Sequence, residues 1–372
     1  MAFSDLFNIF KKSDTSVLGI DVGASSIKIV QLKKKRGKAI LETYGELALG
    51  PYGGVEIGRA TNLPNEKIIE GLIDLIKESH VTTKRCGIAI PLSSSLVTFI
   101  KMPAFDNKQL VQMIPIEARK YIPVPITEVS LDWWIVPKED KMVPSGMDTE
   151  QKPNPEKDTI DVMVVAIHNE ALSKYRDITT KASLESSFFE IEIFSTIRAS
   201  LEQGIEAVMI LDMGAGTTKL YIVEKGVLQS SHTINRGSQD ITLAISRAMG
   251  KEVNEAENLK RIIGLSAKPE DKTLNEVITL TLDYIFYESN RVLLNYQKKN
   301  NKDISKVVLT GGGVLLKGFA EMARTSFQTD VVLADPFGKV QTPAFLNDVL
   351  NTAGPEFAVA LGIALRKLGE VE

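Results

Sequence analysis

The sequence predicts an α/β protein of two similar lobes, each built on a hairpin that turns through aspartate and glycine. The first hairpin contains Gly19-Ile20-Asp21-Val22-Gly23. In the second half of the chain the segment 211–216, Leu-Asp-Met-Gly-Ala-Gly, repeats this device after a buried strand. Short apolar runs alternate with stretches of helical period on both sides of the repeat. Such a duplication predicts two lobes that face each other across a cleft.

The composition is that of a soluble globular protein. The 372 residues are 44% hydrophobic and 24% charged, and a chain of this length exceeds one ordinary core. Lys+Arg 44 against Asp+Glu 47 gives a net charge of −3, so we expect no nucleic-acid partner. The single cysteine, Cys86, excludes a disulfide framework and suits a reducing cytosol, and three histidines argue against a zinc site.

The N-terminal segment 1–13 has an amphipathic pattern. Phe3, Leu6, Phe7 and Phe10 fall on one helical face and precede two lysines. This pattern predicts a helix that lies on a membrane or a partner, or else a short helix packed on its own domain. No stretch is long and apolar enough to span a bilayer, and we expect no signal peptide.

In the first half of the chain we expect a hairpin over 17–32, broken at 23–26, and a small module of one strand, one helix and two strands. Its two last strands flank a stretch, 138–158, that is rich in proline, glycine and charge, which predicts a disordered insertion. The other expected elements are helices over 66–79, 107–121, 169–182 and 190–203 and strands over 86–90, 96–101, 129–136 and 159–167.

In the second half we expect a strand over 207–211, a turn over 212–218 and a returning strand over 220–223, with a further strand from Gly226. Helices are predicted over 239–249, 255–263 and 275–298. A strand over 306–309 runs into Gly311, Gly312 and Gly313, and a helix follows from Leu316. A last helix is expected over 355–368.

The two turns have the chemistry of a phosphate site. Successive N–H groups in a glycine-rich turn form an anion-binding concavity. Asp21 and Asp212 suit a hydrated Mg²⁺ that keeps most of its waters. The residues predicted to surround phosphate are Gly23, Ala24, Ser25, Ser26 and Lys28 in the first turn and Gly214, Ala215, Gly216, Thr217 and Thr218 in the second.

Two further groups complete the predicted nucleotide site. The glycines Gly311–Gly313 follow a buried strand, which lets backbone pass beside a base or a phosphate. Glu257 and Lys260 share a helical face. They are candidates for ribose and adenine contacts, although such a pair is also typical of a solvated face.

These loops, in this order, resemble those of the actin/Hsp70/sugar-kinase superfamily. The module after the first sheet is similar to the relocated subdomain of the cell-division protein FtsA. The segment 117–125, Glu-Ala-Arg-Lys-Tyr-Ile-Pro-Val-Pro, with the 308–313 and 355–362 segments, resembles the type IV pilus assembly protein PilM family.

The resemblance implies an actin/Hsp70-like fold of duplicated ribonuclease-H-like lobes with an FtsA-like small subdomain. It divides the chain into the N-terminal segment 1–13, a first lobe of 14–91, 168–205 and 342–372, the small subdomain 92–167, a second lobe of 206–245 and 305–341, and a helical subdomain 246–304. It also implies ATP between the lobes and Glu257 and Lys260 as adenosine contacts.

The implied partner is the cytoplasmic tail of a PilN-like inner-membrane protein, held in a groove beside the small subdomain. The protein would then lie in the cytoplasm at the inner face of the membrane. It would associate with the membrane through partners, and self-association stays open.

Hydrolysis is expected to be weak or absent. Members that hydrolyse ATP well place a Glu or Gln where the helix before the second turn begins. Alignment of this sequence puts Phe194 or Ser195 there and Glu192 out of register. A polymerising cytoskeletal protein and, with less support, a small-molecule kinase are the alternatives, but no dedicated substrate motif is legible.

Overall fold

The computed structural model describes residues 16–136, 159–202, 204–266 and 268–370. The predicted N-terminal segment and the 138–158 insertion therefore lie outside the described residues. The chain forms two compact units: unit 1 is Met1–Ala89 with Asp177–Glu372, and unit 2 is Ile90–Arg176. The range predicted for the small subdomain, 92–167, falls within unit 2.

Unit 1 contains two five-stranded sheets of one topology. The first has the order β3-β2-β1-β4-β8 and the second β11-β10-β9-β12-β13. In each, an antiparallel hairpin (β1 with β2, β9 with β10) is followed by a strand parallel to its first member (β4, β12). The predicted duplication is thus present strand by strand.

The first lobe holds β1 (Ser16–Val22), β2 (Ser26–Lys35), β3 (Lys38–Ala48), α1 (Asn65–Glu78), β4 (Arg85–Ile90), β8 (Glu185–Ile191), α4 (Glu192–Ser200), α9 (Asn347–Ala353) and α10 (Ala358–Gly369). The second lobe holds β9 (Ala207–Met213), β10 (Thr218–Glu224), β11 (Val227–Ile234), α5 (Ser238–Met249), α6 (Val253–Ile262), α7 (Lys272–Asn300), β12 (Ile304–Thr310), α8 (Phe319–Ser326) and β13 (Asp330–Leu333).

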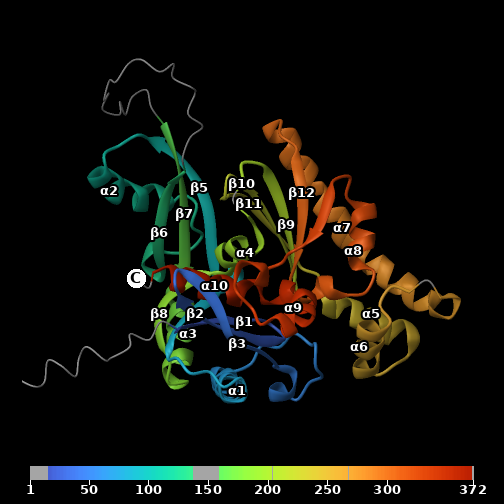
Figure 1. Cartoon of the computed structure of the whole chain (residues 1–372). Coiled ribbons are helices and arrows are strands. Elements are labelled where there is room, and N and C mark those ends of the chain that lie inside the picture. The colour runs from blue at the N-terminus through green and yellow to red at the C-terminus, as the bar shows by residue number, and fades with distance from the viewer. Residues whose placement is uncertain (1–15, 137–158, 203, 267, 371–372) are drawn as a thin grey trace, which may run out of the picture. The chain divides into compact units, whose positions relative to one another are not determined.

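Close backbone packing joins α10 to β1 and α4 in the first lobe. A Cβ at Gly19 would lie 2.0 Å from the Ala360 carbonyl oxygen, and one at Gly362 would lie 2.0 Å from that of Ser195. Both positions therefore require glycine. Figure 1 shows α4 and α10 at the centre of unit 1, between the two sheets. Phe337, within the range predicted for the second lobe, packs in the first lobe's core.

The second lobe has its own core, in which the apolar faces of α5, α6, α7 and α8 cover the sheet. Ile241, Ile245, Ala256 and Phe286 pack there against Met209 and Leu211 of β9. No helix among the described residues is long and apolar enough to cross a membrane.

Unit 2 is a three-stranded antiparallel sheet with one helix packed on it. Its elements are β5 (Ser95–Pro103), α2 (Asn107–Ala118), β6 (Val129–Val136), β7 (Thr159–His168) and most of α3 (Asn169–Lys181), and the strand order is β5-β7-β6. Asp106 caps α2 by accepting a hydrogen bond from the Gln109 N–H at 2.8 Å. Leu110, Ile114 and Ala118 of α2 are buried against the sheet.

Two boundaries differ from the prediction in ways that matter. The helix expected over 190–203 begins at Glu192, because Glu185–Ile191 is strand β8. The helix expected over 107–121 ends at Ala118. The prediction also missed β3 and β13.

Candidate nucleotide-binding site

The two glycine turns are alike to the level of single hydrogen bonds. The N–H of Gly23 donates to the Ser26 carbonyl oxygen at 2.9 Å, and the N–H of Gly214 donates to that of Thr217 at 2.9 Å. Each bond closes a tight turn between two buried strands, while the turn itself is at least partly exposed. Backbone N–H groups in such turns can accept an anion, so the turns fit a phosphate.

An aspartate and a lysine lie opposite each other beside each turn. Asp21 of β1 is in register with Lys28 of β2, and Asp212 of β9 is in register with Lys219 of β10. Directly opposite residues of antiparallel strands project to the same face of the sheet. The sequence analysis missed Lys219, although it follows Asp212 by the seven residues that separate Lys28 from Asp21.

The two lysines have different partners. The Lys28 ammonium contacts Glu46 of β3 at 2.9 Å and donates to the Ser26 hydroxyl at 2.7 Å. The Lys219 ammonium donates to Oε2 of Glu192, the first residue of α4, at 2.6 Å. Lys28 is therefore bound within its own sheet, whereas Lys219 joins the second lobe to a helix of the first.

The expectation that Phe194 or Ser195 stands at the start of α4 beside the turns is wrong. Ser195 is fully buried and donates to Oε2 of Glu190 at 2.6 Å. Glu192 instead bonds to Lys219 and raises the pKa of both aspartates electrostatically. Strand β8 is the cause of this difference, because β8 extends to Ile191 and the helix therefore begins at Glu192.

The pKa values of the two aspartates are raised mainly because these carboxylates are buried. Burial, with smaller contributions from Glu192 and Asp212, raises the pKa of Asp21 to about 7 against the opposing influence of Lys28 and Lys219. Burial also raises the pKa of Asp212 to about 6, against the influence of Lys219 and Lys28. Carboxylates held at such a cost are typical of functional sites.

No three Asp, Glu, His or Cys side chains of the described residues are grouped closely enough to hold a metal ion by themselves. The carboxylates of Asp21 and Asp212 fit a cation held through water and through a ligand's phosphates, rather than a site made of protein ligands alone, and the Lys28 ammonium suits the phosphates.

The glycine run Gly311–Gly313 lies against the second turn. Gly311 has φ +86°, and a Cβ there would lie 2.5 Å from Oδ1 of Asp212. A Cβ at Gly313 would lie 2.4 Å from Cγ of Met213. Only glycine permits this approach. The structure thus brings Gly311 to Asp212 and Gly313 to Met213, while Gly312 lies nearer Glu356.

Glu257 and Lys260 are buried rather than solvated. Their ion pair is 2.7 Å long, and Glu257 also contacts Arg261 at 2.6 Å and accepts from the Thr242 hydroxyl at 2.6 Å. Burial alone would raise the pKa of Glu257, but these partners, Lys260 foremost, hold it below its usual value. These contacts hold both side chains of the pair in place on α6, whereas the side chains of a solvent-exposed i,i+3 pair would be mobile.

A short strap, residues 58–61, touches three of these groups. The Thr61 N–H donates to the Ala24 carbonyl oxygen at 2.8 Å, and the Ala60 N–H donates to Oε1 of Gln239 at 3.0 Å. A Cβ at Gly58 would lie 2.7 Å from Oε1 of Glu257. The strap therefore links the first turn to α5 and α6 of the second lobe. The sequence analysis did not predict this strap, because residues 58–61 contain no motif or periodic pattern that distinguishes them.

One predicted donor has another role. The hydroxyl of buried Thr218 donates to the Arg236 carbonyl oxygen at 2.9 Å, so it stabilises the strand end. Thr217, Ser25 and the backbone of Ala215 and Gly216 remain partly exposed at the turns.

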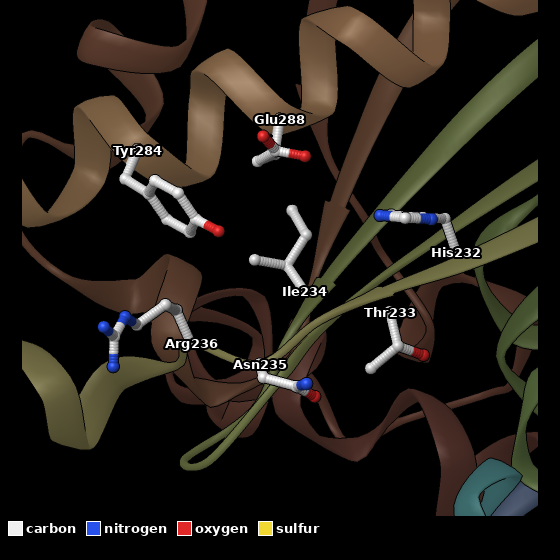
Figure 2. Close-up of a pocket in the computed structure, with 7 residues that line it drawn as sticks. All are labelled: His232, Thr233, Ile234, Asn235, Arg236, Tyr284 and Glu288. Carbon is white, nitrogen blue, oxygen red and sulfur yellow. The ribbon is translucent and has the colours of Figure 1, made fainter.

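A hollow of about 410 Å³ lies elsewhere on the second lobe. Figure 2 shows it between α7, which supplies Tyr284 and Glu288, and the end of β11 with the residues that follow. A second hollow of about 480 Å³ shares Arg236 and Tyr284 with it. None of the predicted nucleotide-site residues lines either hollow.

Comparison with known proteins identifies the family model that the chain matches and the fold that it shares. The family model of the type IV pilus assembly protein PilM matches residues 19–368. The structure of a PilM-PilN type IV pilus biogenesis complex superposes with a TM-score of 0.78 at 23% identity, over 96% of this chain and 99% of that one. MreB5 of Spiroplasma citri bound to ADP superposes with a TM-score of 0.53 at 11% identity, over 95% and 97%. At these identities the likenesses show the fold alone, and they confirm the predicted fold class.

The curated relatives include FtsA cell-division proteins. That of Agrobacterium fabrum is 23% identical over 231 residues, which are 55% of this chain and 51% of the relative. That of Neisseria meningitidis is 23% identical over 354 residues, 85% and 82%. The chain thus spans only about half the length of the Agrobacterium relative.

Proposed function

We propose that this chain, which belongs to the type IV pilus assembly protein PilM family, binds ATP between its two lobes and serves as a nucleotide-dependent scaffold of pilus or related secretion assembly. It works in the cytoplasm, at the inner face of the membrane. There it binds the cytoplasmic tail of a PilN-like inner-membrane partner.

One observation carries the nucleotide proposal: two turns closed by the same hydrogen bond each follow a buried aspartate, and the glycine run lies against the second turn at Asp212. A purely structural hairpin has no need of buried carboxylates whose pKa is raised. The turns support phosphate binding, Gly311–Gly313 supports approach of the base or phosphates, and Glu257 with Lys260 supports contact with the nucleoside. Asp21 and Asp212 would hold Mg²⁺ through its waters.

The partner proposal is supported by exposed apolar side chains on unit 2. Val111, Ile116 and Tyr121 are 59%, 53% and 47% exposed, and Trp134 and Ile135 of β6 are also exposed. Large apolar side chains left exposed in this way are typical of protein-binding regions. We propose that the PilN-like tail binds at unit 2, in a groove beside the small subdomain.

Isothermal titration of the full chain with Mg-ATP tests the first part. We expect binding by the parent and by Lys306→Ala, a control that removes a lysine from β12 of the second sheet. We expect about tenfold or greater loss in Lys28→Ala, since a charge-assisted contact is worth roughly 1.5–3 kcal/mol. A parent that does not bind ATP would refute the nucleotide proposal.

Fluorescence anisotropy with labelled peptides from the cytoplasmic tails of PilN-like proteins tests the second part. Affinity should differ at least severalfold between ATP-saturated and ATP-free protein. Equal affinity in both conditions would contradict nucleotide dependence but leave ATP binding intact. ATP-dependent sedimentation of the chain without a partner would favour the polymerising alternative that the FtsA relatives raise.

A further inference from the structure

Glu192 has the position of a group that acts on water beside a bound phosphate. It is 8% exposed, begins α4, and lies 2.6 Å from the ammonium of Lys219, the residue directly opposite Asp212 in the second hairpin. A carboxylate so placed can orient a water molecule and accept its proton.

The ammonium of Lys219 is hydrogen-bonded to that carboxylate. Its ammonium lies 2.6 Å from Oε2 of Glu192, and the two side chains are only 21% and 10% exposed. At this length the contact is a strong charge-assisted hydrogen bond. Solvent screens a pair of this burial far less than an exposed one.

We propose that Lys219 is a built-in restraint on ATP hydrolysis, which holds Glu192 in an ion pair and so keeps it from activating water. This inference rests on the proposed binding of ATP between the lobes. It replaces the sequence-based reason for slow turnover, an absent carboxylate, with another reason: the carboxylate is present but already bound.

The restrained step is ordinary phosphoryl transfer to water. The water oxygen forms a bond to the γ-phosphorus while the bond from that phosphorus to the β,γ-bridging oxygen breaks, and the electron pair of the broken bond leaves with ADP. The water proton passes to the carboxylate of Glu192 and from there to the released phosphate. While Lys219 donates to Oε2 of Glu192, that oxygen is not available to orient the attacking water.

The electrostatic surroundings favour a charged Lys219. Burial alone would lower the pKa of its ammonium, but Glu192, Asp212 and Asp21 together hold that pKa well above the usual value. Lys28, its counterpart in the first turn, contacts Glu46 and leaves the water-activating position untouched.

Single-turnover hydrolysis of radiolabelled Mg-ATP by the full chain tests the proposal, with the Kd for ATP measured in parallel. At saturating Mg-ATP, Lys219→Met should raise the single-turnover hydrolysis rate at least about tenfold, since general-base action is worth roughly 10² to 10⁴. Lys219→Met with Glu192→Gln should return to the parent rate. Lys306→Met is the control for removal of one lysine from the same sheet.

Three results would overturn the inference. They are an unchanged rate in a Lys219→Met protein that still binds ATP, a double variant as fast as the single one, and loss of binding in Lys219→Met, which would make Lys219 a phosphate ligand instead. Lys219→Gln, which keeps a hydrogen-bond donor, provides the same test if Lys219→Met does not fold. A parent that binds no ATP would refute the proposed function itself, a separate outcome.

Discussion

Replacing Asp212 with asparagine should stabilise the nucleotide-free protein while it abolishes ATP binding. Asp212 is 8% exposed, and burial raises its pKa from 3.8 to about 6. Above pH 6 the folded protein therefore keeps a carboxylate ionised at a cost that the unfolded chain does not have. Two pKa units correspond to about 3 kcal/mol, and asparagine, which resembles the protonated acid, removes that cost.

The sign of the pH dependence follows from the same shift. Below about pH 4 both states hold the proton, so the parent and Asp212→Asn should be about equally stable. Between pH 4 and 6 the folded state binds more protons than the unfolded state, so the parent loses stability as pH rises. The advantage of the variant should therefore grow through this window and level off by about pH 7.

Thermal or urea unfolding in the presence of EDTA, from pH 4 to 8, measures the effect. We expect a gain of up to about 3 kcal/mol at pH 7.5, visible as a melting temperature several degrees higher, together with loss of the stabilisation that Mg-ATP gives the parent. Asp303→Asn, outside the site and in the loop before β12, is the matched control. A variant that is less stable than the parent at pH 7.5, or a difference independent of pH, would refute the reasoning.

Other predictions concern separate parts of the molecule. Glu190→Gln should cost roughly 3–5 kcal/mol of stability, because Arg198 and Arg366 each contact Glu190 at 2.7 Å. Arg198, Ser195 and Arg366 hold the pKa of Glu190 below its usual 4.5 despite burial, so in the parent this contribution should be lost as pH falls below 4.5. Equal acid unfolding of both proteins would contradict this. Gly311→Ala should lose ATP binding and about 1–3 kcal/mol of stability. The control Gly204→Ala, with open space around its Cβ position, should lose neither. Calorimetry measures the ATP binding of both variants, and unfolding measures their stability. Ile116→Asp should weaken binding of the tail peptide at least about tenfold without changing the melting temperature, and Leu294→Asp on α7 is its control; equal loss in both would point to a nonspecific effect.

The sequence predicted those features that the backbone itself demands. Turns that need glycine and a repeated aspartate are visible without tertiary information, so both turns and the duplication could be found. β13 has only four residues, and the apolar residues of β8 run directly into the helical pattern of α4. Neither strand has a period of its own long enough to be recognised.

The error at Glu192 shows how much a boundary matters. A helix turns by about 100° per residue, so an alignment shifted by two residues, from Glu192 to Phe194, assigns the role to a side chain about 200° further round the helix. The structure places the start by pairing β8 in the first sheet, which is a long-range contact. Lys219, by contrast, needed only the observation that the second turn repeats the first to its seventh residue.

The different partners of the two lysines have a mechanical consequence. Lys28 contacts Glu46 within the first sheet, so its contact is indifferent to movement of the lobes. Lys219 belongs to the second sheet, whereas Glu192 begins α4, which packs with α10 on the first. Separation of the lobes must therefore break the Lys219–Glu192 pair, and approach of the lobes must remake it. If a bound nucleotide or partner tail changes the spacing of the lobes, the same movement changes the freedom of Glu192, so scaffold state and hydrolysis are coupled through one ion pair.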